Sequence, residues 1–166
     1  MKKKIAKFEK ISFYEASLSN NNNNTYDELK KMYENLKLPK RATKGSAGYD
    51  FYLPKDIIIP PKSSLVIPTF IRCKIKNNYV LMLFPRSGQG FKYGIRLQNT
   101  CGIIDSDYYN SDNEGHIMVK LYNPNNDEFE LEKGTAFCQG IFVPFGVTLD
   151  DRVKKNRNGG FGSTDN

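Results

Sequence analysis

Histidine and cysteine are scarce in this sequence, and tryptophan is missing. The single histidine, His116, excludes any metal site with two histidine ligands, including the site of the HExxH zinc hydrolases. The three cysteines, Cys73, Cys101 and Cys138, form no CxxC pair and cannot all be joined to one another in disulfides. We therefore expect reduced thiols and a cytoplasmic protein.

Long apolar runs and the common phosphate-binding loops are also missing. No hydrophobic stretch long enough for a signal peptide or a membrane span follows the basic N-terminus, so we expect no membrane association. The sequence has no GxxxxGK[ST] motif, and Gly88, Gly90 and Gly94 do not form a GxGxxG motif. Any nucleotide chemistry must therefore use another scaffold.

The composition that remains is that of a single basic domain. With 166 residues, of which 39% are hydrophobic, the chain can close one sizeable core but not two ordinary domains. Lysine and arginine outnumber aspartate and glutamate by 25 to 18, so the surface should attract an anion such as a nucleotide, a nucleic acid or an acidic lipid. For the lysine cluster near the N-terminus we favour a solvated face, and we expect no nucleic-acid partner.

Short apolar runs punctuated by glycine, proline and asparagine predict an all-β fold. Strands at this density favour a sandwich or a distorted jelly-roll β-barrel, which we place at residues 1–148. Within residues 70–75, apolar and charged side chains alternate, so this strand should bury one face and expose the other. The other candidate strands are residues 5–13, 57–59, 64–68, 79–84, 116–122, 129–131 and 136–143.

Two stretches depart from the strand pattern. An insertion of about residues 15–38 should hold one short helix near the N-terminus, with Thr25 as its N-cap and Leu29 and Met32 at helical spacing. Residues 149–166 are polar and then rich in glycine, which predicts a flexible C-terminal arm. On composition alone, this arm is either disordered or orders only over a ligand.

Five segments carry residue types that strands and turns do not explain. The second combines the donor fork of Arg86, the hydroxyl of Ser87 and the close backbone approach at Gly88, which suits a triphosphate. The third places Asp105 beside an apolar strand, where a carboxylate can orient a water and accept its proton. Taken alone, this third segment could equally be an acidic β-hairpin. The five segments are residues 45–51, 85–94, 99–119, 133–139 and 157–164.

Together, from about residue 39 onward, these segments resemble the ordered motifs of the homotrimeric dUTPase family. The resemblance implies a dUTP pyrophosphatase in which Asp105 activates the water that attacks the α-phosphorus, with Mg2+ held mainly by the substrate phosphates. It also implies a homotrimer whose sites combine motifs of different chains, the arm crossing from a neighbour.

The resemblance also assigns roles to single residues. Asp50 would organise the phosphate and metal side, and Tyr108 would lie under the deoxyribose and leave no space for a 2′-hydroxyl. Uracil would pair with backbone groups of a hairpin, and Phe161 would stack on the base as part of a lid. The substrate-binding residues so implied are Arg86, Ser87, Gly88, Asn99, Gly102, Ile103, Ile104, Tyr108, Met118, Gln139, Arg157, Phe161, Gly162, Ser163 and Thr164.

Several features depart from the family pattern. The fourth motif matches only at Gly134 and Gln139, and residues 109–114 form a second insertion that should project outward from the hairpin tip.

The nearest alternative is a dCTP deaminase of the same fold, which would have its catalytic glutamate where this chain has Lys120. A non-enzymatic jelly-roll module that binds a partner through its basic face is the alternative from another class.

Overall fold

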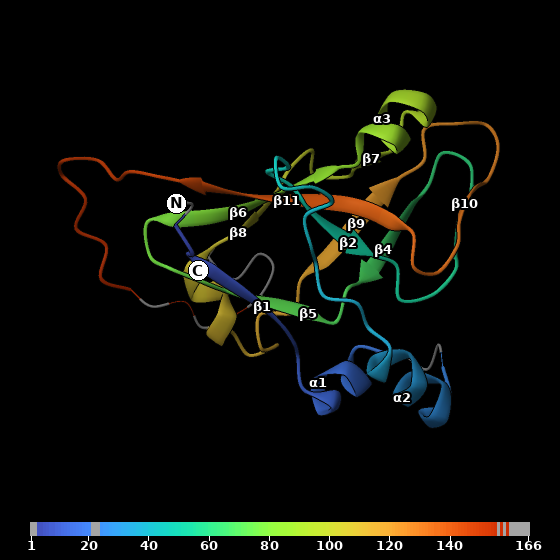
Figure 1. The fold of residues 1–166 in the computed structure, drawn as a ribbon, viewed down its shortest axis with the longest axis horizontal. Coiled ribbons are helices and arrows are strands. Elements are labelled where there is room, and N and C mark those ends of the chain that lie inside the picture. Colours follow the sequence, from blue (N-terminus) through green and yellow to red (C-terminus); the bar gives the residue numbers. More distant parts are fainter. Residues whose placement is uncertain (1–2, 21–23, 156, 158, 160–166) are drawn as a thin grey trace.

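Eleven antiparallel strands dominate the computed structural model, which describes residues 3–20, 24–155, 157 and 159 (Figure 1). This confirms the all-β, jelly-roll-like fold predicted from the sequence. The strands form four small sheets. In hydrogen-bonding order they are β2 (Tyr49–Tyr52), β11 (Ala136–Pro144), β6 (Tyr79–Pro85) and β8 (Gly102–Ile104); β4 (Ser64–Pro68), β9 (Met118–Tyr122) and β7 (Arg96–Leu97); β1 (Ala6–Lys10) and β5 (Ile71–Ile75); and β10 (Phe129–Leu131) and β3 (Ile57–Ile59).

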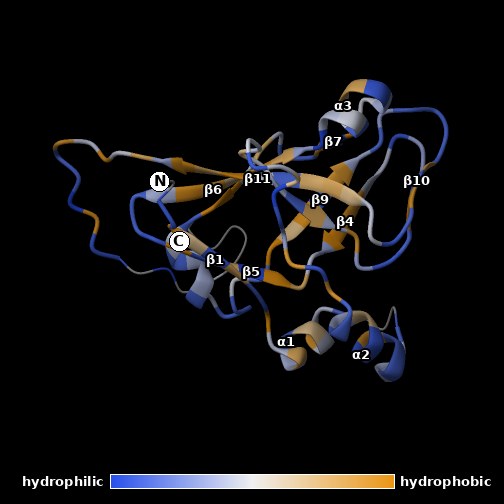
Figure 2. Ribbon diagram, viewed as in Figure 1, coloured by the Kyte–Doolittle hydropathy of each residue, from blue (hydrophilic) through white to orange (hydrophobic). Residues whose placement is uncertain are grey.

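One core unites these sheets. In β5, Ile71, Cys73 and Ile75 are buried while Arg72 and Lys74 face outward, which confirms the predicted alternation. The strands are the most apolar parts of the ribbon, and the loops between them are hydrophilic (Figure 2). All three cysteines are free, and burial raises the pKa of the Cys73 and Cys138 thiols. No helix among the described residues is long and apolar enough to cross a membrane.

The N-terminal insertion forms two helices rather than one. The predicted helix is α2 (Tyr26–Glu34), whose N-cap Thr25 forms a capping box with Glu28. The second helix, α1 (Phe13–Leu18), was not predicted. It begins where the Ser12 hydroxyl accepts a hydrogen bond from the Glu15 N–H, so the first strand ends at Lys10 instead of continuing to residue 13.

The two inserted helices pack against one side of the strand domain, next to β5 (Figure 1). They share a small core of their own with Phe70, which comes directly before that strand. The members of this core are Ile11, Ala16, Leu29, Met32 and Phe70. The insertion is therefore a packed extension of the domain rather than a loose loop.

Two short helices also interrupt the predicted turns at the motifs. Helix α3 (Ser87–Tyr93) follows β6, and a 3₁₀ helix, η1 (Ser106–Asn110), follows β8. The expected hairpin around residues 102–119 is wrong in detail, because β8 pairs with β6 while β9 pairs with β4 and β7. The two strands lie in different sheets, and this leaves a groove between them.

Candidate active site

Polar side chains from three of the motifs meet where β6 ends. Asp50, on β2, is nearly buried, and its carboxylate forms an ion pair of 2.9 Å with the Arg86 guanidinium. Arg86 is only partly covered, and the two residues after it, Ser87 and Gly88, are exposed. A buried carboxylate thus orients a cation whose neighbourhood is open to a ligand.

The fourth motif joins this cluster through Gln139. This residue lies opposite Asp50 in the β11–β2 pairing, and its amide donates a 3.1 Å hydrogen bond to the Pro85 carbonyl. Gly48, in the first motif, lies close to this amide: a Cβ there would lie 2.6 Å from the Gln139 Oε1 and would displace it. We call Asp50, Arg86, Ser87, Gly88 and Gln139 the phosphate cluster.

A second group of predicted residues lines the groove between β8 and β9. Its cavity is about 420 Å³, within the range of small-molecule sites. In the described part of the chain, β8 pairs only with β6, so its other edge presents backbone N–H and C=O groups to the groove. Such an edge can hydrogen-bond a planar base. The predicted residues in this lining are Asn99, Gly102, Ile103, Ile104 and Met118.

Asp105 comes directly after β8, at the first residue beyond the strand. It adopts an extended backbone conformation before η1, and its side chain is 47% exposed. The Arg157 guanidinium lies 3.4 Å from the Asp105 carboxylate and 3.8 Å from the carboxylate of Asp107. The carboxylate is therefore within reach of water and of the arm.

Arg157 is the one predicted substrate-binding residue of the C-terminal arm that lies among the described residues. Besides its two carboxylate partners, its guanidinium lies 5.5 Å from the centre of the Tyr108 ring. The resemblance implies an arm that crosses to a neighbouring chain, whereas here Arg157 contacts Asp105 of its own chain. The remaining predicted lid residues, Phe161, Gly162, Ser163 and Thr164, lie outside the described residues.

Tyr108 is almost completely buried at 3% exposure. Its hydroxyl donates a 2.7 Å hydrogen bond to the His116 carbonyl and accepts one of 2.9 Å from the Asn113 amide. Burial raises the pKa of the Tyr108 phenol, so the hydroxyl stays protonated. The ring is thus a rigid wall rather than a mobile flap.

The predicted outward projection of residues 109–114 is wrong. The segment turns back on the domain: Ser111 is buried and donates to the Tyr108 carbonyl, and Glu114 accepts hydrogen bonds from Ser12. Polar turn formers indicated an exposed loop, but the side chains of Ser111 and Asn113 hydrogen-bond to Tyr108, while Asn110 and Asp112 are exposed. Asn113, Glu114 and His116 are the residues near the site that the sequence analysis missed. The only signal for them was their position directly after Tyr108.

The phosphate cluster and Asp105 lie at opposite ends of β6. Ile104 pairs with Leu81, so Asp105 lies beside the start of β6, whereas Arg86 directly follows its end. At about 3.3 Å per residue, the six steps along the chain from Val80 to Arg86 span roughly 20 Å. Within one chain, the candidate base and the candidate phosphate ligands therefore do not form one site.

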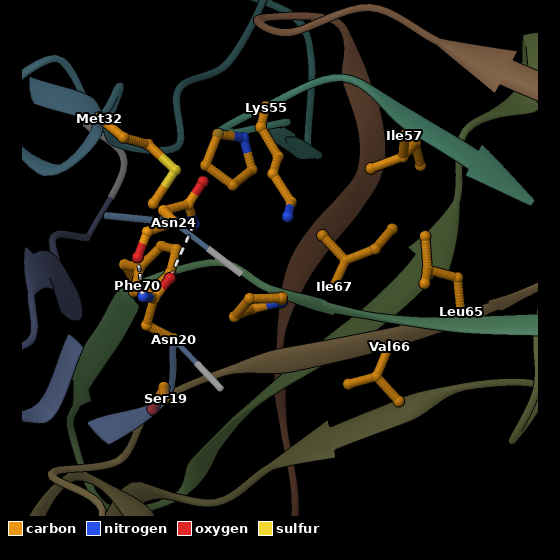
Figure 3. A pocket seen from close by; sticks show the side chains of 12 residues that line it. Ser19, Asn20, Asn24, Met32, Lys55, Ile57, Leu65, Val66, Ile67 and Phe70 are labelled. Atoms are coloured by element: carbon orange, nitrogen blue, oxygen red, sulfur yellow. Dashed lines mark hydrogen bonds between the residues drawn. The ribbon is translucent and has the colours of Figure 1, made fainter. Parts of the chain in front are cut away.

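Another cavity, of about 160 Å³, lies between the inserted helices and β4 (Figure 3). Its lining is largely apolar, with Met32, Ile67 and Phe70 on its walls, and Lys55 extends beside it. None of the predicted site residues lines this cavity. In the part of the chain that the structure describes, no group of three or more His, Cys, Asp or Glu side chains could hold a metal ion.

Comparison with known proteins points to one family. A family model described as dUTPase matches residues 34–165. The deoxyuridine 5'-triphosphate nucleotidohydrolase of Lactococcus lactis is 39% identical over 142 residues, which cover 82% of this chain and 95% of that protein. The crystal structure of dUTPase from Streptococcus mutans is 33% identical, with a TM-score of 0.65 over 85% of this chain and 97% of the other.

A more distant likeness supports the fold alone. A mutant dUTPase from phage phi11 of S. aureus, described with a structural Mg(II) ion, has a TM-score of 0.65 at 18% identity. The match covers 92% of this chain and 98% of that one. Strand arrangement is therefore retained where most residues differ.

Proposed function

The chain belongs to the dUTPase family and hydrolyses dUTP, and from this premise we propose how its residues divide the reaction. The observation that carries the proposal is the position of Asp105. It is half exposed and comes directly after β8, which lines the groove between β8 and β9. It also lies beside Tyr108 and Arg157. A carboxylate placed there can accept a proton from a water at the α-phosphate of a nucleotide whose base occupies the groove.

The proposed chemical step is a direct displacement. The water oxygen bonds to the α-phosphorus while the bond from that phosphorus to the oxygen bridging to the β-phosphorus breaks. The departing pyrophosphate keeps the electron pair, and Asp105 takes a proton from the water. The products are dUMP and pyrophosphate, so no oxidant, reductant or second substrate is required.

The phosphate cluster would neutralise and orient the triphosphate. Arg86 supplies a fixed cation, Ser87 a hydroxyl, and Gly88 an open backbone where a Cβ would meet nothing within 4 Å. A metal cofactor fits this arrangement. Mg2+ prefers oxygen ligands and retains waters, so the triphosphate itself would supply most of its ligands and Asp50 could hold one of its waters. When bound, Mg2+ would neutralise charge on the phosphate oxygens.

The groove and Tyr108 would select the nucleoside. The free edge of β8 can hydrogen-bond uracil through backbone groups, and the buried Tyr108 ring would exclude a 2′-hydroxyl by shape. Lys120 lies on β9, where a deaminase of this fold would carry its catalytic glutamate. This difference favours hydrolysis over deamination.

We also propose that the enzyme is a homotrimer with shared sites. The separation of roughly 20 Å along β6 supports this, because a single chain cannot present Asp105 and Arg86 to the same phosphate chain. A closed ring of identical chains would bring the start of one β6 to the end of the next. Each site would then take Asp105 and Tyr108 from one chain and the phosphate cluster from another.

Release of pyrophosphate from dUTP, dCTP, dTTP and UTP in the presence of Mg2+ tests the specificity. The expected result is turnover of dUTP with little activity toward the other three. Ammonia released from dCTP would instead assign the chain to the deaminases. Equal turnover of dUTP and dTTP would contradict recognition of uracil in the groove.

Mixing two inactive variants tests the shared site. Asp105→Asn and Arg86→Ala, each inactive or weak alone, should regain activity when co-expressed, because some interfaces combine an intact Asp105 with an intact Arg86. For random assembly of a trimer, roughly a quarter of the sites would be complete. Activity no greater than the sum of the separate variants would show that each site lies within one chain.

A further inference from the structure

The Tyr108 ring is held by a loop that is itself held by the N-terminal insertion. The loop consists of residues 109–116, and we refer to it together with α1 and its caps, residues 12–19, as the α1 clamp. Asn113 provides the direct contact, since its amide donates to the Tyr108 hydroxyl at 2.9 Å. Its carbonyl oxygen accepts a hydrogen bond of 3.2 Å from the Gly115 N–H, which fixes the orientation of the amide.

The loop closes tightly against Tyr108. The backbone N–H and the hydroxyl of Ser111 both donate to the Tyr108 carbonyl, at 3.0 and 2.6 Å. Gly115 has a φ of +71°, and a Cβ there would lie 2.7 Å from the same carbonyl oxygen. Only glycine allows this approach without strain. The loop therefore has little freedom to move independently of Tyr108.

Residues at both ends of helix α1 hydrogen-bond to the loop. Before the helix, the N–H and the hydroxyl of Ser12 donate to the Glu114 carboxylate at 2.7 and 2.6 Å. After the helix, the Ser19 hydroxyl lies 3.2 Å from the Nδ1 of His116. The Phe70 N–H donates to Nε2 of His116, so Nδ1 carries the proton of the neutral ring and donates to Ser19.

Three further contacts connect the clamp to the strand domain. The Arg72 guanidinium, on β5, lies 4.3 Å from the centre of the Tyr109 ring and 3.8 Å from the Glu114 carboxylate. The Tyr109 hydroxyl donates to Glu9 on β1. Both inserted segments, α1 and residues 109–114, thus meet around the residues that follow Tyr108.

We propose that the α1 clamp sets the position of Tyr108 and thereby the discrimination between deoxyribose and ribose, with Asn113 as its principal positioning residue. The proposal rests on the proposed role of Tyr108 at the sugar. The Tyr108 ring can exclude a 2′-hydroxyl by shape only if it cannot move away by a fraction of an ångström. The contacts that hold Tyr108 in place therefore determine the selectivity between deoxyribose and ribose. Among the described residues, no hydrogen bond or ion pair joins the clamp to the side chains of the phosphate cluster or of Asp105, so loss of the clamp should leave the hydrolytic step largely intact.

Asn113→Ala is the principal test, with Asp112→Ala as its matched control in the same loop. Asp112 is exposed, whereas Asn113 holds the Tyr108 hydroxyl. The measured quantity is the ratio of kcat/KM for dUTP to that for UTP. Loss of one buried hydrogen bond should lower this ratio by up to about tenfold for Asn113→Ala. The ratio for Asp112→Ala should equal that of the wild type.

A second pair of variants tests the helix itself. Ser12→Ala removes a donor to Glu114, while Ser17→Ala removes a hydroxyl of α1 that donates only to the Tyr14 carbonyl among the contacts of the described residues. Ser12→Ala should lower the dUTP to UTP ratio about threefold, and Ser17→Ala should not change it. If Asn113→Ala and Ser12→Ala each lose activity toward dUTP and UTP by the same factor, the role of the clamp is purely structural and the proposal is overturned.

The same assay separates this inference from the proposed function. A wild-type enzyme that accepts UTP as well as dUTP, or a Tyr108→Ala variant that still rejects UTP, would contradict the role of Tyr108 itself. If the wild type rejects UTP, Tyr108→Ala accepts it, and Asn113→Ala still rejects it, the role of Tyr108 holds and the clamp alone fails.

Discussion

The two ends of β6 carry two different kinds of binding surface. At its end, the phosphate cluster has one ion pair, between Arg86 and Asp50, and exposed residues beside it. At its start, Tyr108 is buried, and both its hydroxyl and its carbonyl are hydrogen-bonded to the loop that follows. Under the proposed division of roles, the first surface would attract by charge, and the second would exclude by shape.

This difference follows from what each surface would bind. A triphosphate is flexible and highly charged, so a cation can hold it over a range of positions. A single hydroxyl group on a sugar differs little in energy from a hydrogen unless the wall beside it is rigid. The insertions packed around Tyr108 supply that rigidity, and nothing comparable surrounds Arg86.

Asp105→Asn should show the largest effect, and it tests whether the start of β6 holds the chemistry. The amide cannot accept the proton of the attacking water, so kcat for dUTP should fall by at least about 10³-fold. Asp107→Asn is the matched control, since its carboxylate is 56% exposed against 47% for Asp105 and also faces Arg157. Similar losses in both variants, measured as pyrophosphate release, would contradict a unique base.

The buried histidine of the α1 clamp should make the start of β6 sensitive to acid. Burial lowers the pKa of His116 from 6.5 to about 4, so between these values the unfolded chain binds a proton that the folded chain does not. Stability should therefore fall as the pH drops from 6.5 to 4, by up to about 3 kcal/mol from this residue.

Denaturant unfolding at several pH values, at one fixed chain concentration, measures this loss. His116→Gln keeps an acceptor for the Phe70 N–H but cannot titrate, so its stability should depend less on pH. Parallel pH dependence of the wild type and this variant would show that His116 is not the responsible group.

Arg86→Ala tests the opposite end of β6. Loss of a charge-assisted contact to the triphosphate should lower kcat/KM for dUTP roughly 30-fold, or about 2 kcal/mol, without changing the dUTP to UTP ratio. Lys92→Ala, which removes an exposed cation on α3, the helix that follows Arg86, should have little effect. A changed ratio in Arg86→Ala would mean that the two ends of β6 do not divide charge and shape recognition between them.

Gly115→Ala should have the smallest effect of the four, and it acts on stability. The positive φ and the contact with the Tyr108 carbonyl should cost about 1–2 kcal/mol in the free energy of unfolding. Gly146→Ala, where a Cβ would meet nothing within 4 Å, is the control. Equal thermal midpoints for the two variants would show that the loop tolerates displacement.

Much of the fold could be read from local patterns. Alternation predicted β5, and Thr25 as N-cap with Leu29 and Met32 at helical spacing predicted α2, because both patterns depend on residues that are neighbours in the sequence. The phosphate cluster followed from motif resemblance, and the structure brings its members together. Helix α1 was missed because its capping residue, Ser12, was read as part of a strand.

The sequence by itself determined the chemical inventory: one histidine, one candidate base, one arginine beside serine and glycine, and a family resemblance that carries dUTP hydrolysis. The tertiary structure decided where these groups stand, including the separation of Asp105 from Arg86 along β6 and the inward fold of residues 109–114. Ser12 and Glu114 are separated by 102 positions, so their hydrogen bond depends on tertiary packing and not on neighbouring residues. Local propensities act over a few residues, whereas such contacts depend on the packing of the whole chain.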